Sequence, residues 1–182
     1  VETHTDILVG LPEETRDSQV NTLRKCFDYG FDFIDAKHVI LLAGSDMETD
    51  ESRERFGLKS KFRLKQGCYG IYDGIAAFEY EECIRGTNTI SEEQMHEMRI
   101  LHWLLWWGWN SGFIKPILTL LQEQGVNPVN VLLQIIHDDK SKYPSVSKLF
   151  DDFLADSKGE WFDTGKEIHV YYSKLENLKK IL

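Results

Sequence analysis

The chain has 182 residues, a formal net charge of −9 and a sequence pI near 5.1. With 42% hydrophobic and 28% charged residues it can build an ordinary globular core. The acidic balance excludes a general binder of nucleic acid or of anionic membranes, because both need a basic face. No apolar run reaches the roughly 18 residues that a membrane span needs, and we expect a cytoplasmic protein.

The first forty residues predict a strand, a helix and a second strand. Residues 5–10 contain three consecutive apolar side chains, a pattern typical of a strand covered on both faces. Apolar residues at helical spacing follow over 17–29, with a threonine or an aspartate as the candidate cap and Gly30 after the last turn. Residues 33–42 are rich in Ile, Val, Leu and Phe. This order predicts a βαβ unit with parallel strands.

The rest of the chain predicts one more strand and then helices. The highly charged segment 48–65 indicates a surface loop or short helix, and the glycines of 67–74 indicate an irregular connection. Weak alternation over 78–89 predicts a third strand. Ser91 and Gln94 form a capping-box pattern that opens a long helix to about Trp109. Further helices are expected at 113–124, 129–138, 145–156, 165–172 and 174–182.

The predicted fold class is therefore α/β. We expect a partial TIM-barrel-like βαβ unit with parallel strands over residues 1–90, followed by a mostly α-helical extension over 91–182. Two or three parallel strands are too few for a complete domain. We therefore expect a fragment whose missing N-terminal part is its main partner.

The stretch Gly10-Leu11-Pro12 resembles the end of the fifth barrel strand in the radical S-adenosylmethionine (radical SAM) enzymes. That strand end follows the pattern G-x-I-x-G-x-x-E, often written out as V-G-L-P-G-E-T. Leu8 stands at the isoleucine position, Gly10 at the second glycine and Glu13 at the acid, while Asp6 replaces the first glycine. Residues 41–47, L-L-A-G-S-D-M, resemble the L-L-P-G-T-E-L end of the sixth strand.

Three further segments resemble the branch of this family that carries a cobalamin-binding domain upstream. They are 55–59, 81–82 and 87–91. The resemblance implies a parent enzyme that uses S-adenosylmethionine and a 4Fe-4S cluster, with cobalamin as a further candidate cofactor. The family's cluster-binding C-x-x-x-C-x-x-C does not occur in these 182 residues. The fragment is accordingly expected to be inactive alone and to bind none of these cofactors by itself.

The resemblance also implies an adenine site at the C-terminal ends of two strands, where ligands of parallel barrels bind. Leu8 would give adenine an apolar surface, and Gly10 would let the ligand approach the backbone because it lacks a Cβ. Backbone groups of Leu41 and Leu42 could hydrogen-bond the adenine edge. The sequence identifies neither the small-molecule substrate nor a catalytic residue.

No metal site is predicted within the chain. Cys26, Cys68 and Cys83 are widely spaced, which indicates reduced thiols without a zinc or iron–sulfur motif. The acidic pairs Asp138-Asp139 and Asp151-Asp152 lack ligand spacing and indicate solvated helix faces.

A second hypothesis is a non-catalytic helical interaction domain with a tryptophan-rich docking face. Trp103, Trp106 and Trp107 would share one face of the long helix, while His102 among them is more typical of an aromatic core. His38, with Asp35 and Lys37, could point into a barrel, although a lone histidine on a strand is more often structural.

Overall fold

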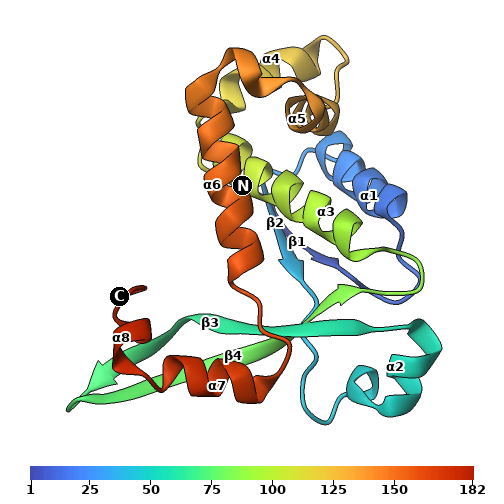
Figure 1. The fold of residues 1–182 in the computed structure, drawn as a ribbon. Helices are drawn as coiled ribbons and strands as arrows, with labels where there is room; N and C mark the ends of the chain where they lie inside the picture. Colours follow the sequence, from blue (N-terminus) through green and yellow to red (C-terminus); the bar gives the residue numbers. More distant parts are fainter. The chain divides into compact units, whose positions relative to one another are not determined.

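The computed structural model describes residues 1–182 as a mixed α/β protein with two separate two-stranded sheets and no closed barrel (Figure 1). The strands are β1 (His4–Val9), β2 (Phe33–His38), β3 (Lys59–Tyr72) and β4 (Ile75–Gly86). The helices are α1 (Arg16–Asp28), α2 (Asp50–Phe56), α3 (Glu92–Leu105), α4 (Lys115–Glu123), α5 (Pro128–His137), α6 (Pro144–Gly159), α7 (Gly165–Tyr172) and α8 (Leu175–Leu178). None of them is both long enough and apolar enough to cross a membrane.

The chain forms two compact units, and neither is continuous in sequence. The first unit contains residues 1–39 and 86–148, and the second contains 40–85 and 149–182. Residues within each unit contact one another more than they contact the other unit. The two units therefore differ from the division at residue 90 that the change from strands to helices suggested.

The predicted βαβ unit is confirmed in the first unit. β1 and β2 pair in parallel, with Asp6 opposite Asp35, Leu8 opposite Lys37 and Val9 opposite His38. Thr15 caps α1 in a reciprocal capping box with Ser18, which satisfies two of the N–H groups that a helix start leaves open.

Helices cover one face of this sheet. Ile7 and Val9 of β1 and Ile34 of β2 are buried, as are Val20 and Phe27 of α1. α1, α3 and α5 pack against one another (Figure 1), and α3 also contacts β2. Side chains of the opposite parity remain exposed or partly exposed: His4, Asp6, Leu8, Phe33, Asp35 and Lys37. The expectation of a strand covered on both faces therefore does not describe β1, because its alternate residues face outward.

A bidentate ion pair joins α1 to α3. Arg16 Nε and Nη2 each donate to a different oxygen of the Glu97 carboxylate at 2.7 Å. Both side chains are largely shielded from water, and this pairing lowers the pKa of Glu97 below its ordinary value. His137 of α5 meets the same carboxylate at 3.0 Å, so this one side chain of α3 contacts both α1 and α5.

α3 begins at the predicted Ser91–Gln94 capping box and continues into a π-helical turn, Trp106–Asn110. Trp109 is buried against Phe27 at a ring-centroid distance of 4.8 Å and donates from Nε1 to the carbonyl of Asp32. The Asn110 amide donates to the Ile34 carbonyl, and its oxygen accepts from the Ile34 N–H. The turn therefore fixes the end of α3 to the start of β2.

In the second unit, β3 and β4 form a long antiparallel hairpin. Asp73 and Gly74 make its turn, both with positive φ. Ile168, Tyr172 and Leu178 form a small buried cluster, against which partly buried side chains of the hairpin pack: Phe62, Leu64, Tyr69, Ile71, Ala76 and Phe78.

Several predicted boundaries were wrong. β2 ends at His38 rather than at residue 42. The segment 59–65, predicted as loop or short helix, is the first half of β3, and the third strand belongs to a second sheet rather than to the parallel one. The last helix is shorter than predicted, whereas α7 has the predicted bounds.

Candidate functional site

The candidate adenine site begins at the C-terminal end of β1. Leu8 is 44% exposed on the sheet face that no helix covers, one residue before the end of β1. Gly10 follows with φ +97°, a conformation that strongly favours glycine. Leu8 is therefore available to a ligand, and Gly10 is needed by the backbone whether or not a ligand binds.

A carboxylate closes the turn after β1. The Gly10 N–H donates to Glu14 Oε2 at 2.9 Å, and the Glu14 N–H donates to the Leu11 carbonyl at 3.2 Å. Partial burial raises the pKa of Glu14, while hydrogen bonding of its carboxylate to the backbone of Gly10 and Leu11 acts in the opposite direction. Glu14 thus makes the contact, one residue after the acid position that the family pattern assigned to Glu13. Glu13 itself has φ +65°, which suits the second glycine of V-G-L-P-G-E-T better than an acid.

Leu41 and Leu42 belong to the second unit, where they follow an isolated antiparallel bridge between Ile40 and Cys83. The Leu41 N–H donates to the Glu82 carbonyl at 2.8 Å, and the Leu42 carbonyl accepts from Ser45 at 3.0 Å. The Leu41 side chain is buried and that of Leu42 is 65% exposed. The backbone groups predicted to meet adenine are the N–H and carbonyl of Leu41 and Leu42. The two bonds above use the Leu41 N–H and the Leu42 carbonyl, and they do not involve the Leu41 carbonyl or the Leu42 N–H.

The structure also groups four side chains that the sequence did not connect. His4 and Asp6 on β1 lie beside Asp35 and Lys37 on β2, all on the uncovered face. His38 has the opposite parity and lies on the packed face, so it does not share this surface with Asp35 and Lys37. Alternation along each strand could have indicated that His4 and Asp6 share one face of β1, and that Asp35 and Lys37 share one face of β2. Only the register between the strands places these two pairs side by side.

The other candidate residues have structural surroundings. His102 is buried, and burial lowers its pKa to about 4, with the nearby positive charge of Arg99 acting in the same direction. It is therefore neutral at physiological pH, as expected for a core histidine. Asp138 and Asp139 are exposed, as are Asp151 and Asp152.

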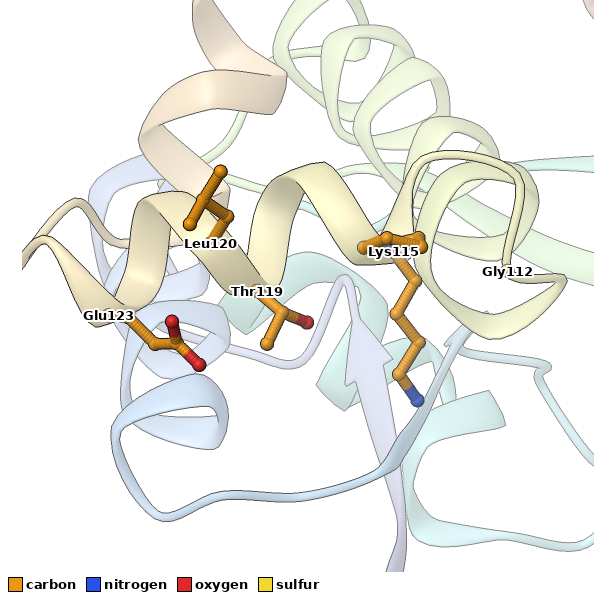
Figure 2. A pocket seen from close by; sticks show the side chains of 6 residues that line it. Gly112, Lys115, Thr119, Leu120 and Glu123 are labelled. Carbon is orange, nitrogen blue, oxygen red and sulfur yellow. The ribbon is translucent and has the colours of Figure 1, made fainter.

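A shallow hollow of about 540 Å³ lies along α4. Figure 2 shows Lys115, Thr119, Leu120 and Glu123, all side chains of this one helix. Lys115 lies over the Trp109 ring at 4.6 Å and donates to the Asp32 carbonyl at 3.2 Å, which gives it a role in packing. A surface formed by one face of one helix does not enclose a ligand.

The chain was compared with known proteins. A scan against protein-family models finds no match, and a search of curated protein sequences finds none either.

Proposed function

We propose that the chain is the C-terminal part of a radical SAM enzyme of the cobalamin-binding branch. In this proposal the residues contribute the adenine side of the S-adenosylmethionine pocket and a helical extension. The cysteines that hold the 4Fe-4S cluster lie outside these 182 residues, so the chain is inactive alone.

The observation that carries this proposal is the arrangement of β1 and β2. Two parallel strands joined by a helix expose one face, and helices cover the other. In a parallel barrel the uncovered face would be the interior, and the C-terminal strand ends would form the ligand site. Leu8 lies on that face beside that end, and the turn at Gly10 and Pro12 leads the chain away from it.

The residues present fit one part of the cofactor. An exposed leucine suits the flat, apolar face of adenine, and a glycine backbone permits close approach. In such an enzyme the iron–sulfur cluster supplies the electron that cleaves S-adenosylmethionine, while residues of this chain bind and orient the nucleoside.

The first test is the coding sequence upstream of Val1. The proposal expects a C-x-x-x-C-x-x-C motif there, and its absence from a longer reading frame would refute the assignment.

The second test measures ligand binding in the longer protein. Leu8→Asn should weaken S-adenosylhomocysteine binding about tenfold in calorimetry, because a polar amide replaces an apolar surface under the base. Leu120→Asn on α4 is a matched control, since Leu120 is also an exposed leucine. Equal affinities in the two variants would remove Leu8 from the site. Leu8 suits this test better than Gly10, because changing an exposed side chain leaves the turn intact.

The interaction-domain hypothesis is second. It needs Trp103, Trp106 and Trp107 on one accessible face. Trp106 is 50% exposed, but Trp103 and Trp107 are only partly exposed, and the Trp107 ring stacks on Phe113 at 5.0 Å. One exposed tryptophan gives a docking face much less area than the sequence suggested.

A further inference from the structure

The uncovered face of β1 and β2 carries a compact cluster of ionisable groups. His4 Nε2 lies 3.2 Å from Asp6 Oδ1. Lys37 Nζ lies 3.0 Å from Asp35 Oδ2 and 3.5 Å from Asp6 Oδ2. The four residues come from two adjacent strands, so the sheet backbone fixes where each side chain starts.

The register makes this cluster unusual for a sheet surface. Asp6 lies directly opposite Asp35, and like charges at directly opposite positions destabilise a pair of strands. Lys37 offsets the repulsion by contacting both carboxylates. Local conflicts of this kind are expected where a sequence serves function rather than folding.

A nitrogen ligand completes the set. One ligand atom each from His4, Asp6 and Asp35 lies within 4.8 Å of the other two. The His4 ring also packs on Phe33 at a centroid distance of 4.6 Å, and Phe33 packs edge-on against Trp106 at 5.4 Å. This aromatic contact holds the imidazole beside the carboxylates.

We propose that His4, Asp6 and Asp35 form a binding site for a divalent transition-metal cation, with Lys37 as the internal cation that occupies the site when no metal is bound. The inference uses residues of the first unit alone and does not depend on the proposed function.

The chemistry of the ligands selects the class of metal. One imidazole and two carboxylates suit first-row ions such as Mn²⁺, Fe²⁺ or Zn²⁺, whereas Mg²⁺ prefers an all-oxygen shell. Three protein ligands on an open face leave further coordination positions to solvent or to a small oxygen ligand, as in catalytic rather than structural sites.

Lys37 contacts the carboxylates of both Asp6 and Asp35, so it should oppose the binding of a metal ion there. A metal bound by both carboxylates competes with the Lys37 ammonium, because the two positive charges repel each other and use the same carboxylate oxygens. Removing this charge should therefore tighten metal binding, whereas removing a carboxylate should weaken it. A nonspecific acidic surface would not depend on the identity of these two positions.

The test titrates Mn²⁺ into the 182-residue chain and follows the free ion by electron paramagnetic resonance. One Mn²⁺ should bind per chain. Asp35→Asn should weaken binding roughly tenfold. Lys37→Met should tighten it about fivefold. Zn²⁺ should displace Mn²⁺, and Mg²⁺ at the same concentration should not. Asp138→Asn, which changes an exposed carboxylate outside the cluster, should have no effect.

A measurement on the unmodified chain covers the case in which a variant does not fold. Bound Mn²⁺ should broaden the His4 imidazole proton signals in NMR at concentrations that leave those of His137 sharp. His137 is a matched control, because it also meets a carboxylate, that of Glu97, at 3.0 Å. Equal broadening of the His4 and His137 signals would overturn the proposal. So would an unchanged Mn²⁺ affinity in a folded Asp35→Asn variant or in a folded Lys37→Met variant.

Discussion

Replacing Gly10 by alanine tests whether the turn after β1 depends on its backbone conformation. Gly10 has φ +97°, and holding an alanine in such a region costs about 1–3 kcal/mol. Alanine also restricts the unfolded chain, which offsets about 0.4–1 kcal/mol of that cost. If the backbone relaxes instead, the part-buried hydrogen bond from the Gly10 N–H to the Glu14 carboxylate at 2.9 Å is lost, at about 1.5–3 kcal/mol.

We therefore expect Gly10→Ala to lower the free energy of unfolding by about 2 kcal/mol. Urea unfolding followed by tryptophan fluorescence measures this, since Trp109 is buried in the same unit. Gly30→Ala is the matched control, because Gly30 has φ +77° and its added Cβ would have no neighbour within 4 Å. The control should lose less, about 1 kcal/mol. A Gly10→Ala protein at least as stable as the Gly30→Ala protein would refute the reasoning.

Three further outcomes are expected. Arg16→Met should destabilise the chain by about 3 kcal/mol at pH 7 in urea unfolding, because it leaves the Glu97 carboxylate shielded and without its guanidinium. The folded-state pKa of Glu97 is lowered, so the ion pair stabilises the fold above the ordinary pKa of 4.5, and this stabilisation is lost as the pH falls through the folded-state pKa. The difference in free energy of unfolding between wild type and Arg16→Met should therefore shrink on acidification. A difference that grows would contradict the assignment. Iodoacetamide at pH 8 should modify the partly exposed Cys68 and leave the buried Cys83, whose pKa is raised to about 12, unmodified in intact-protein mass spectrometry. Anaerobic reconstitution with iron and sulfide should leave the chain without a stoichiometric cluster, and four irons per chain would contradict the proposed position of the cluster ligands.

The βαβ unit could be predicted because its signals are local. The apolar run of β1, the helical spacing of α1 and the glycine after its last turn each depend on a few neighbouring residues. The hairpin was not recognised in the same way. Its first strand does alternate, with Phe62 and Leu64 between charged residues that are paired across to β4, including Arg63 with Glu81 and Lys65 with Glu79. The high density of charge nevertheless suggested a surface loop. The Asp73-Gly74 pair was a second overlooked signal, because this dipeptide favours tight hairpin turns.

The candidate site likewise has features that neighbouring residues determine and features that long-range pairing determines. The position of Leu8 near a strand end and the turn at Gly10 follow from neighbouring residues, whereas the run of three apolar residues did not predict that Leu8 is exposed. The proximity of His4, Asp6 and Asp35 depends on the register between strands that are 29 residues apart in the sequence at their paired positions, which no local pattern encodes. The contact of Leu41 with Glu82 likewise depends on a long-range bridge.

The contact between Asn110 and Ile34 determines the direction in which the parallel sheet can grow. The Phe33 N–H donates to the Thr3 carbonyl and the Val39 N–H donates to the Val9 carbonyl, so odd-numbered residues of this segment direct their backbone groups toward β1. Ile34, which is even-numbered, therefore directs its N–H and carbonyl to the opposite edge of β2. The Asn110 side chain takes both groups there, at 3.2 and 2.8 Å, and occupies the place of a neighbouring strand. An added strand would have to displace this amide to pair with the start of β2. Extension is therefore favoured along β1, and the same amide protects the start of β2 from edge-to-edge association with other chains.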